Sequence, residues 1–359
     1  MGLDSGAGLV DQWPVLGRHV RAAEWLRVWA DLGRAPRTID AYARGLAEYL
    51  LVCERVGVDP VVASRAHVAA FVRELTERPS HRGVNVVSID SGSGLANATI
   101  QQRIVPVRLF YDFLIEEGLR ESNPVGRGRY TPRGRRGGQQ RGLVPRMTKL
   151  PWIPTEQQWL ALLEVAAGEP VRNRVMLALA YDAALRREEL CSLRTEDLDP
   201  GRRTLRVRAE VTKNRMERVV PYSAPTGVLL SEYLAHRAMI SRARGPLFLS
   251  ESRRNRAQPL TLWTWSKVVR RIALAADLPR FSTHTTRHLC LTDLARMGWE
   301  LHAIARFAGH RSTESTLTYI HLSGRDLADK LAMGMDQIHA WRVEMLARVS
   351  EQPTQTAAR

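Results

Sequence analysis

The sequence predicts a mainly α-helical protein of two domains, the second of which contains a small antiparallel β-sheet. Its 359 residues are enough for two separate hydrophobic cores. Apolar residues recur at helical spacing along most of the chain, whereas residues 204–210 and 218–222 alternate as strands do. A stretch without any acidic residue, 122–155, separates the two regions. We therefore expect a helical domain over residues 18–124 and an α+β domain over residues 152–349.

The first region has the pattern of a compact helical module. Residues 1–17 are expected to be a flexible leader, and helices are predicted at 19–32, from Pro36 to Gly57, from Ser64 to Leu75 and over 99–117. The polar, glycine- and serine-rich residues 79–95 predict a loop. Pro106 lies inside the last helix and should kink or break it. A generic helical bundle would fit this region equally well.

Residues 125–151 are predicted to be a basic linker. Seven arginines and six glycines fall between residues 126 and 146. Such a composition favours a disordered tether in the free protein. When the protein binds nucleic acid, we expect the tether to lie along the phosphates. The arginines expected to make these phosphate contacts are Arg127, Arg129, Arg133, Arg135, Arg136 and Arg141.

Composition points to a polyanionic partner. The formal net charge is +16, and four lysines among 53 basic residues leave 53 − 4 = 49 arginines, which suit bidentate phosphate contacts. The three cysteines are far apart and odd in number, so they predict neither a disulfide framework nor a zinc site. No signal peptide or membrane-length apolar run is evident, so we expect a cytoplasmic protein without a membrane partner.

The second region begins with a capping box, Thr155 to Gln158, and continues into a helix expected to be buried at 171–181. The two strands and a hairpin between them follow, then a short strand at 246–249 and an amphipathic helix at 263–276. A helix capped by Ser282 or Thr283 should end at Gly298, and the next should end at Gly309. Residues 327–349 predict a last helix, and 350–359 a disordered tail.

Chemically active side chains gather between residues 281 and 322. Five of the ten histidines lie between residues 284 and 321, together with Arg287 and Tyr319. Any one of these residues alone would more often be an ordinary surface group on a helix. Their combination predicts a site for a phosphodiester. The residues concerned are His284, Arg287, His288, His310 and Tyr319.

This pattern resembles the C-terminal boxes of the tyrosine recombinase (phage integrase) family: His-x-x-Arg-His, then Gly-His, then Tyr nine residues later. DAALRREEL resembles the family's first box, with Arg186 and Glu189 in place and Ala184 where glycine is usual, so the turn must form without glycine's freedom. VTKNRMERVVP resembles the hairpin that carries a lysine, here Lys213. PRTIDAYARGLAEYL, TIQQRIVPVRLFYDFLIEEG and the closing Asn-Pro are similar to the helical core-binding domain. The resemblance covers about residues 20–345.

The resemblance implies a role for each matching residue in breaking a phosphodiester without a metal or cofactor. Tyr319 would attack the phosphorus and form a 3′-phosphotyrosyl bond, while Arg186 and Arg287 stabilise charge on the non-bridging oxygens. Lys213 would protonate the leaving 5′-oxygen. Proton handling is implied for His284 and His310, and a supporting role for Glu189 and His288.

The implied partners are double-stranded DNA and further copies of the chain, as a tetramer whose C-terminal helices dock in trans. An accessory DNA-bending protein or a partner recombinase would be compatible with this, as would association with the nucleoid. A type IB topoisomerase uses a similar residue set, so DNA relaxation by a monomer stays open. A catalytically inactive DNA-binding accessory factor is a second alternative. An RNA-binding protein is the weakest, because no aromatic stacking motif is apparent.

Overall fold

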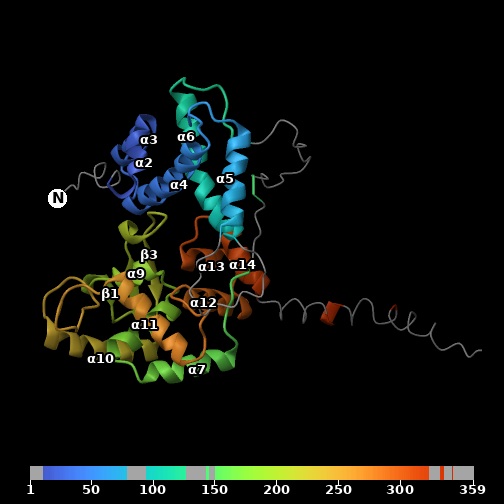
Figure 1. Cartoon of the computed structure of the whole chain (residues 1–359). Helices are drawn as coiled ribbons and strands as arrows, with labels where there is room; N and C mark the ends of the chain where they lie inside the picture. The colour runs from blue at the N-terminus through green and yellow to red at the C-terminus, as the bar shows by residue number, and fades with distance from the viewer. Residues whose placement is uncertain are drawn as a thin grey trace, which may run out of the picture. The chain divides into compact units, whose positions relative to one another are not determined.

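The structure is a computed structural model that describes residues 11–78, 94–126, 143–144, 150–322, 332–334 and 342. The chain divides into two compact units, Met1–Thr148 and Lys149–Arg359 (Figure 1). All six arginines expected to contact DNA from the linker lie outside the described residues, as do most of the loop expected at 79–95 and most of the helix expected at 327–349.

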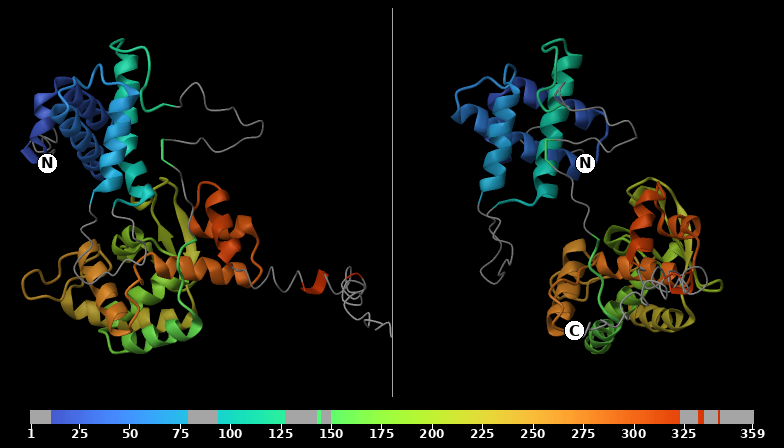
Figure 2. Two further views of the ribbon diagram at one scale, coloured as in Figure 1. Left: turned by 45° about the vertical axis from the view of Figure 1, so that its right-hand side comes forward. Right: turned by 90° about the vertical axis from the view of Figure 1, so that its right-hand side faces the viewer.

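The first unit consists of helices around one core. Its elements are α2 (Pro14–Arg18), α3 (Val20–Asp31), α4 (Pro36–Arg55), α5 (Arg65–Glu77) and α6 (Asn97–Glu116). Helices α4, α5 and α6 pack side by side (Figure 2). The hydroxyls of Tyr49 and Tyr111 lie 2.6 Å apart inside the core, and Tyr111 donates to the carbonyl of Pro60 at 2.8 Å. The core therefore satisfies its buried hydroxyls, as a stable fold requires.

Both ends of this unit differ from the prediction. The flexible leader expected over residues 1–17 is wrong for its last part, because α2 forms there and buries Val15 and Leu16. The linker expected to begin at residue 125 also contributes to the unit. Val125 and Val144 are buried in the same core, and Gln101 donates to the carbonyl of Val144 at 3.1 Å. Composition did not predict this burial, because the segment as a whole is basic and rich in glycine and its few apolar residues form no helical pattern.

Pro106 does not break α6, which runs through it from Asn97 to Glu116. The prediction of a break was wrong, and the reason lies on α4. A Cβ atom at Gly45 would lie 2.6 Å from Cγ of Pro106 and 3.2 Å from the carbonyl oxygen of Arg103. The glycine thus lets α4 approach α6 closely at the proline, and packing offsets the hydrogen bond that proline cannot donate.

The second unit combines helices with a three-stranded antiparallel sheet. Its helices are α7 (Glu156–Ala167), α8 (Val171–Asp182), α9 (Arg187–Cys191), α10 (Ala224–Ile240), α11 (Leu262–Ala275), α12 (Thr285–Arg296), α13 (Leu301–Ala308) and α14 (Glu314–Leu322), with 3-10 turns η1 (Thr195–Asp197) and η2 (Ala209–Val211). The strands β1 (Leu198–Asp199), β2 (Thr204–Val207) and β3 (Arg218–Pro221) lie in that order. In the register of β2 and β3, Leu205 faces Val220 and Val207 faces Arg218.

The mainly α fold with a small antiparallel sheet is confirmed, with local differences. Residues 246–249 form no strand; they make only isolated bridges, Arg194 with Pro246 and Leu249 with Pro259. Tyr233 accounts for part of this, because its hydroxyl donates to the carbonyl of Leu247 at 2.9 Å and so takes a group that a strand partner would use. The two-residue β1 was not predicted, since it is too short to show a period.

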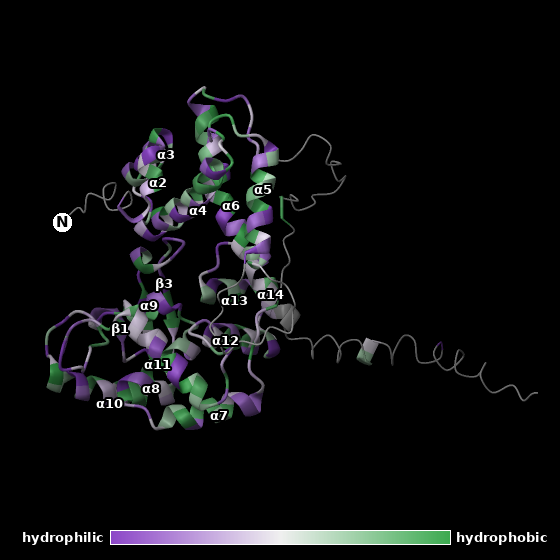
Figure 3. Cartoon of the chain, viewed as in Figure 1, coloured by the Kyte–Doolittle hydropathy of each residue, from purple (hydrophilic) through white to green (hydrophobic). Residues whose placement is uncertain are grey.

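The helix boundaries follow from local chemistry. Thr155 accepts from the backbone N–H of Gln158 at 3.3 Å, and the Gln158 side chain accepts from Thr155 N at 3.0 Å, so the predicted capping box is present. Gly298 and Gly309 have positive φ values of 80° and 62°, as helix-ending glycines do. Hydrophobic and hydrophilic residues share most helices in Figure 3, as amphipathic helices around a core require. Within the described part of the chain, no helix has the length and apolar character needed to cross a membrane.

Candidate active site

The site begins at the turn between α8 and α9. Ala184 adopts φ = +45°, a left-handed conformation that costs a non-glycine residue roughly 1–2 kcal/mol. Two features hold it there: Ala184 is fully buried, and its carbonyl accepts a hydrogen bond from Nη1 of Arg287 at 2.5 Å. The turn is thus made with positive φ in spite of the missing glycine. It places Arg186 at the N-cap of α9.

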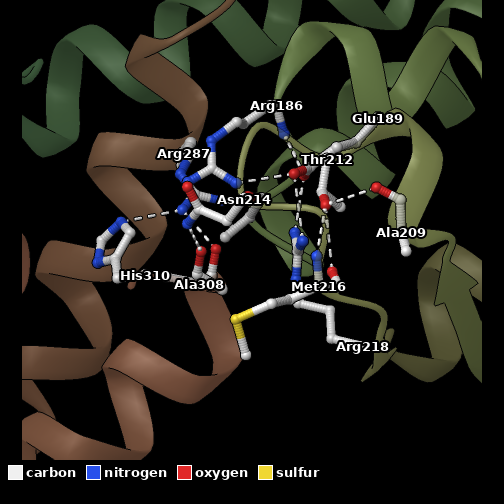
Figure 4. Close-up of polar contacts among 12 residues, drawn as sticks. Arg186, Glu189, Ala209, Thr212, Asn214, Met216, Arg218, Arg287, Ala308 and His310 are labelled. Carbon is white, nitrogen blue, oxygen red and sulfur yellow. Dashed lines mark hydrogen bonds and ion pairs between the residues drawn. The ribbon is translucent and has the colours of Figure 1, made fainter. Parts of the chain in front are cut away.

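Glu189 lies between two arginines (Figure 4). Its Oε1 accepts from Nη1 of Arg186 at 2.8 Å and from Nη1 of Arg218 at 3.1 Å. Its Oε2 accepts from the backbone N–H of Arg186 at 2.9 Å and from Nη2 of Arg218 at 2.7 Å. Burial raises the cost of this carboxylate's charge, yet the bonds and charges of Arg218 and Arg186 lower the pKa of Glu189 to about 2. The carboxylate is therefore ionised at neutral pH.

Arg287 is held from three sides. It lies in the first turn of α12, and besides the carbonyl of Ala184 it donates to the carbonyl of Ala308 at 2.6 Å and to Nε2 of His310 at 3.0 Å. Burial and the nearby charge of Arg186 lower the pKa of Arg287 to about 10, so the guanidinium remains charged at neutral pH. In the part of the chain that the structure describes, no carboxylate forms an ion pair with this buried cation, so an anion would be strongly favoured beside it.

His310 follows Gly309 and is fixed through both ring nitrogens. Because Arg287 can only donate, Nε2 of His310 accepts, and the proton lies on Nδ1, which contacts Oγ1 of Thr316 at 2.8 Å. Burial, followed by the charges of Arg287 and Arg186, lowers the pKa of His310 to about 4. The ring is neutral at pH 7 and stacks on Tyr319, with ring centroids 6.0 Å apart and 9° between the planes.

Tyr319 is buried on α14, and its hydroxyl lies 3.0 Å from Nδ1 of His288. Burial raises the pKa of Tyr319, against the lowering effect of the charges of Arg287 and Arg186. Burial, then the charge of His284, lowers the pKa of His288 to about 4. His288, expected only to support the site, is thus the neutral base nearest to the tyrosine oxygen among the contacts of the described residues.

His284 lies at the N-cap of α12, a position that was predicted for Ser282 or Thr283. Ser282 instead binds ahead of the helix: its hydroxyl accepts from the backbone N–H of His284 at 3.3 Å. The side chain of His284 is exposed, and its ring centroid lies 6.4 Å from that of His288. Partial burial and the charges of Arg187, Arg287 and Arg186 lower its pKa.

Lys213 lies exposed in the connection between β2 and β3. Its neighbour Asn214 fastens this connection to the site by donating to the carbonyl of Gly309 at 3.1 Å (Figure 4). No contact of the described residues fixes the lysine ammonium against Arg186, Arg287 or Tyr319. Lys267, the other lysine of the described second unit, lies over the ring of Trp263, 3.5 Å from its centroid.

The structure thus brings Arg186, Arg287, His310 and Tyr319 into one linked cluster with Glu189 and His288, and leaves Lys213 and His284 at its exposed edge. Sequence reasoning missed three members of the network: Arg218, Asn214 and Thr316. A signal existed for the first. Arg218 shares a face of β3 with the buried Val220, and an arginine at an inward-facing position needs a partner.

The groups of this cluster are suited to a reaction on an anionic ester. Two guanidinium groups and neutral imidazoles surround a buried phenol, which is a suitable arrangement for stabilising negative charge beside a nucleophile. In the described part of the chain, no three His, Cys, Asp or Glu side chains gather as they would around a metal ion.

The α+β fold and this cluster define the class of tyrosine-dependent recombinases and integrases. Residues 154–325 match the model of the phage integrase family. The tyrosine recombinase of Thermosipho africanus is 28% identical over 294 residues, which cover 81% of this chain and 91% of the relative. The tyrosine recombinase XerC of Mycobacterium tuberculosis is 27% identical over 242 residues, covering 65% of this chain and 75% of the relative.

Solved structures share the fold. The XerH recombinase bound to its palindromic difH substrate aligns with a TM-score of 0.63 at 20% identity, over 82% of this chain and 79% of that one. The Tn1549 transposon integrase in complex with a circular intermediate DNA aligns with a TM-score of 0.61 at 17% identity, over 82% of this chain and 93% of that one. A lambda integrase dimer bound to a core site aligns with a TM-score of 0.60 at 17% identity, over 84% of this chain and 94% of that one. At these identities the likeness establishes the fold.

The lowered pKa values of His288 and His310 predict a pH dependence of stability. An unfolded histidine has a pKa of about 6.5. Because both folded values are lower, at about 4, the unfolded state binds protons first, and stability present above pH 6.5 is lost as the pH falls toward 4. Each group can add a slope of up to about 1.4 kcal/mol per pH unit. Urea unfolding between pH 7.5 and 4.5 measures it.

His288→Asn and His310→Asn should each show a shallower fall in the free energy of unfolding over this interval. Glu189 adds the same fall to the wild type and to both variants, because its unfolded carboxyl begins to bind protons near the low end of this interval, whereas the folded one does so only near pH 2. His302→Asn, which removes an exposed histidine from α13, is the matched control. Identical slopes for the wild type and both site variants would contradict this explanation.

Proposed function

We propose that this chain is a site-specific DNA recombinase that cuts and rejoins DNA strands through a 3′-phosphotyrosyl intermediate. The observation that carries the proposal is the single buried cluster in which Tyr319 lies against His288 and stacks on His310, which Arg287 holds. A neutral buried phenol does not require positively charged neighbours for its stability. A phosphodiester entering beside it would supply the missing anion.

In the proposed reaction, the Tyr319 oxygen attacks the phosphorus, the bond to the 5′-oxygen breaks, and the new phosphotyrosyl ester conserves the energy for rejoining. The Tyr319 proton passes first to the base nearest to it, His288. Negative charge grows on the non-bridging oxygens, and the free donors of Arg186 and Arg287 stabilise it. The phosphate would replace His310 as an acceptor for Arg287. His310 would then donate to the phosphate from Nε2 after its proton moves to that nitrogen, while the Thr316 hydroxyl donates to Nδ1.

We assign Lys213 as the acid that protonates the departing 5′-oxygen, and His284 as a further proton handler at the exposed edge. The mobility of an exposed lysine on the β2–β3 connection suits this role, because the acid must approach the ester only after DNA binds. The tether on Asn214 keeps the connection at the site meanwhile. The basic residues Arg127, Arg129, Arg133, Arg135, Arg136 and Arg141 are proposed to bind the DNA backbone.

The proposed assembly is a homotetramer on two DNA sites, with the C-terminal helix expected at residues 327–349 docking in a neighbouring copy. A lambda integrase with a similar fold was solved as a dimer bound to a core site, which supports an assembly of several copies on DNA. The protein would act in the cytoplasm on nucleoid DNA, integrating, excising or resolving a mobile element or replicon. An accessory DNA-bending protein or a second recombinase would be a natural addition.

The test is a plasmid with two copies of the DNA site, found by mapping the covalent adduct on a library of DNA flanking the protein's own gene. We expect adduct formation with a free 5′-hydroxyl and recombinant products that require both sites. Relaxation of a supercoiled plasmid that has no such site, with no recombinants, would instead indicate the topoisomerase alternative. Binding without any adduct would indicate an inactive accessory factor.

A further inference from the structure

Arg218 is a charged residue inside the site for which the reaction described above has no use. Its side chain is 9% exposed, against 20% for Arg186, and it comes from β3 rather than from the helices that carry the other groups. Both of its Nη atoms bond Glu189, whose own side chain is fully buried. Arg218 therefore binds this carboxylate with two side-chain nitrogens, whereas Arg186 binds it with one side-chain nitrogen and its backbone N–H.

The division of donors between the two arginines decides what is left for a substrate. Arg186 gives one side-chain nitrogen, Nη1, to Glu189, and in the described part of the chain Nε and Nη2 make no hydrogen bond. One carboxylate and two guanidinium groups leave one net positive charge. Without Arg218, Glu189 would neutralise Arg186 and draw more of its donors toward itself, since a buried carboxylate must be paired.

Arg218 has a second attachment, at the turn that carries His310. Its Nε donates to the carbonyl of Phe307 at 3.1 Å, near the end of α13. A Cβ atom at Gly309 would lie 3.1 Å from Nη1 of Arg218, so the glycine leaves space for the guanidinium. One side chain thus joins α9, through Glu189, to the carbonyl of Phe307, three residues before His310, on the other side of the cluster.

We propose that Arg218 is a positioning residue that neutralises Glu189, so that Arg186 keeps its charge and its free donors for the scissile phosphate, and that it fixes the turn at Gly309 in the same step. The inference rests on the proposed function. It assigns separate roles to the two arginines: Arg186 contacts the phosphate, and Arg218 acts through Arg186 and touches no reacting atom.

The experiment measures the rate of covalent adduct formation on a nicked DNA substrate at saturating DNA, together with DNA affinity and thermal unfolding. Arg218→Met should slow adduct formation about 100-fold, the effect of losing one charge-stabilising donor, with little change in DNA affinity. Arg218→Lys keeps the charge and should lose far less. The decisive variant is Arg218→Met combined with Glu189→Gln, which removes the uncompensated carboxylate and should recover about 10-fold of the lost rate.

Arg208→Met is the matched control. Arg208 comes from the end of the neighbouring strand and pairs with another buried carboxylate, Asp197, at 3.0 Å, but this pair is separate from the cluster. The control should lose thermal stability without a comparable loss of adduct rate. If the double variant is no faster than Arg218→Met, or if Arg218→Lys is as slow as Arg218→Met, the charge-balancing role is overturned.

Glu189→Gln also relieves the buried charge left by Arg218→Met and should raise its melting temperature, so the adduct rates are compared at a temperature where every variant is fully folded. The wild type separates this inference from the proposed function. If the wild-type protein forms no adduct, the proposed function fails. If it forms the adduct and Arg218→Met forms it equally fast, only the positioning role fails.

Discussion

Replacement of Tyr319 by phenylalanine is expected to abolish the covalent protein–DNA adduct while DNA binding is retained. The change removes one oxygen, the proposed nucleophile, and keeps the ring that stacks on His310 in the core of α12, α13 and α14. Losing a nucleophile costs many orders of magnitude, so adduct formation should fall by more than about 10⁴-fold. A nicked substrate, from which the cleaved strand diffuses away, traps the adduct for denaturing gel electrophoresis.

Tyr181→Phe provides the control for loss of a buried hydroxyl. Tyr181 packs against the same small core, and its hydroxyl donates to Asp293 at 2.8 Å. This variant should unfold at a lower temperature and still form the adduct. An adduct that persists in Tyr319→Phe at the wild-type rate would assign the nucleophile to another residue and refute the proposed mechanism.

The second large effect concerns Lys213. If its ammonium protonates the departing 5′-oxygen, then Lys213→Ala should cleave ordinary DNA about 10²–10⁴-fold more slowly than the wild type. This factor is the usual contribution of a general acid. A 5′-bridging sulfur makes a leaving group that needs no proton, because a thiol is far more acidic than an alcohol. The variant should therefore cleave a 5′-bridging phosphorothiolate at nearly the wild-type rate.

Arg186→Ala is the comparison that gives the sulfur experiment its meaning. Arg186 is proposed to stabilise charge on the non-bridging oxygens, and sulfur at the bridging position does not replace that role. Equal rescue of both variants, or rescue of neither, would remove Lys213 from the acid role. Arg215, exposed on the same connection, would then be the residue to test, ahead of Lys267, which lies over the ring of Trp263.

The residue types and their spacing determined much of this protein in advance. Glycine and capping residues end and begin helices through local backbone chemistry, so Thr155, Gly298 and Gly309 marked boundaries that the structure has. Alternation located β2 and β3, because a strand with one buried face needs period two. Arg186, Arg287, His310 and Tyr319 could be selected because their order and spacing are those of a known family.

Features that depend on contacts between distant segments could not be derived in this way. Pro106 stays within an unbroken helix because Gly45, sixty-one positions earlier, leaves room for it. Ala184 holds a positive φ with its carbonyl bonded to Arg287, which lies 103 residues away in the chain. Burial and neighbouring charge, which exist only in the folded chain, set the pKa values of Glu189, His288 and His310.

The division is clearest at Arg218 and Glu189. Local geometry is enough to bring Glu189 near Arg186, because a spacing of three residues at the start of a helix places two side chains on one face. Only tertiary structure could add Arg218, 29 residues further on, since its approach depends on how β3 packs against α9 and α13. Local sequence therefore decided which chemical groups the site contains. The packing of the second unit decided which of them are charged, which are neutral, and which hydrogen-bond donors remain free for a phosphate.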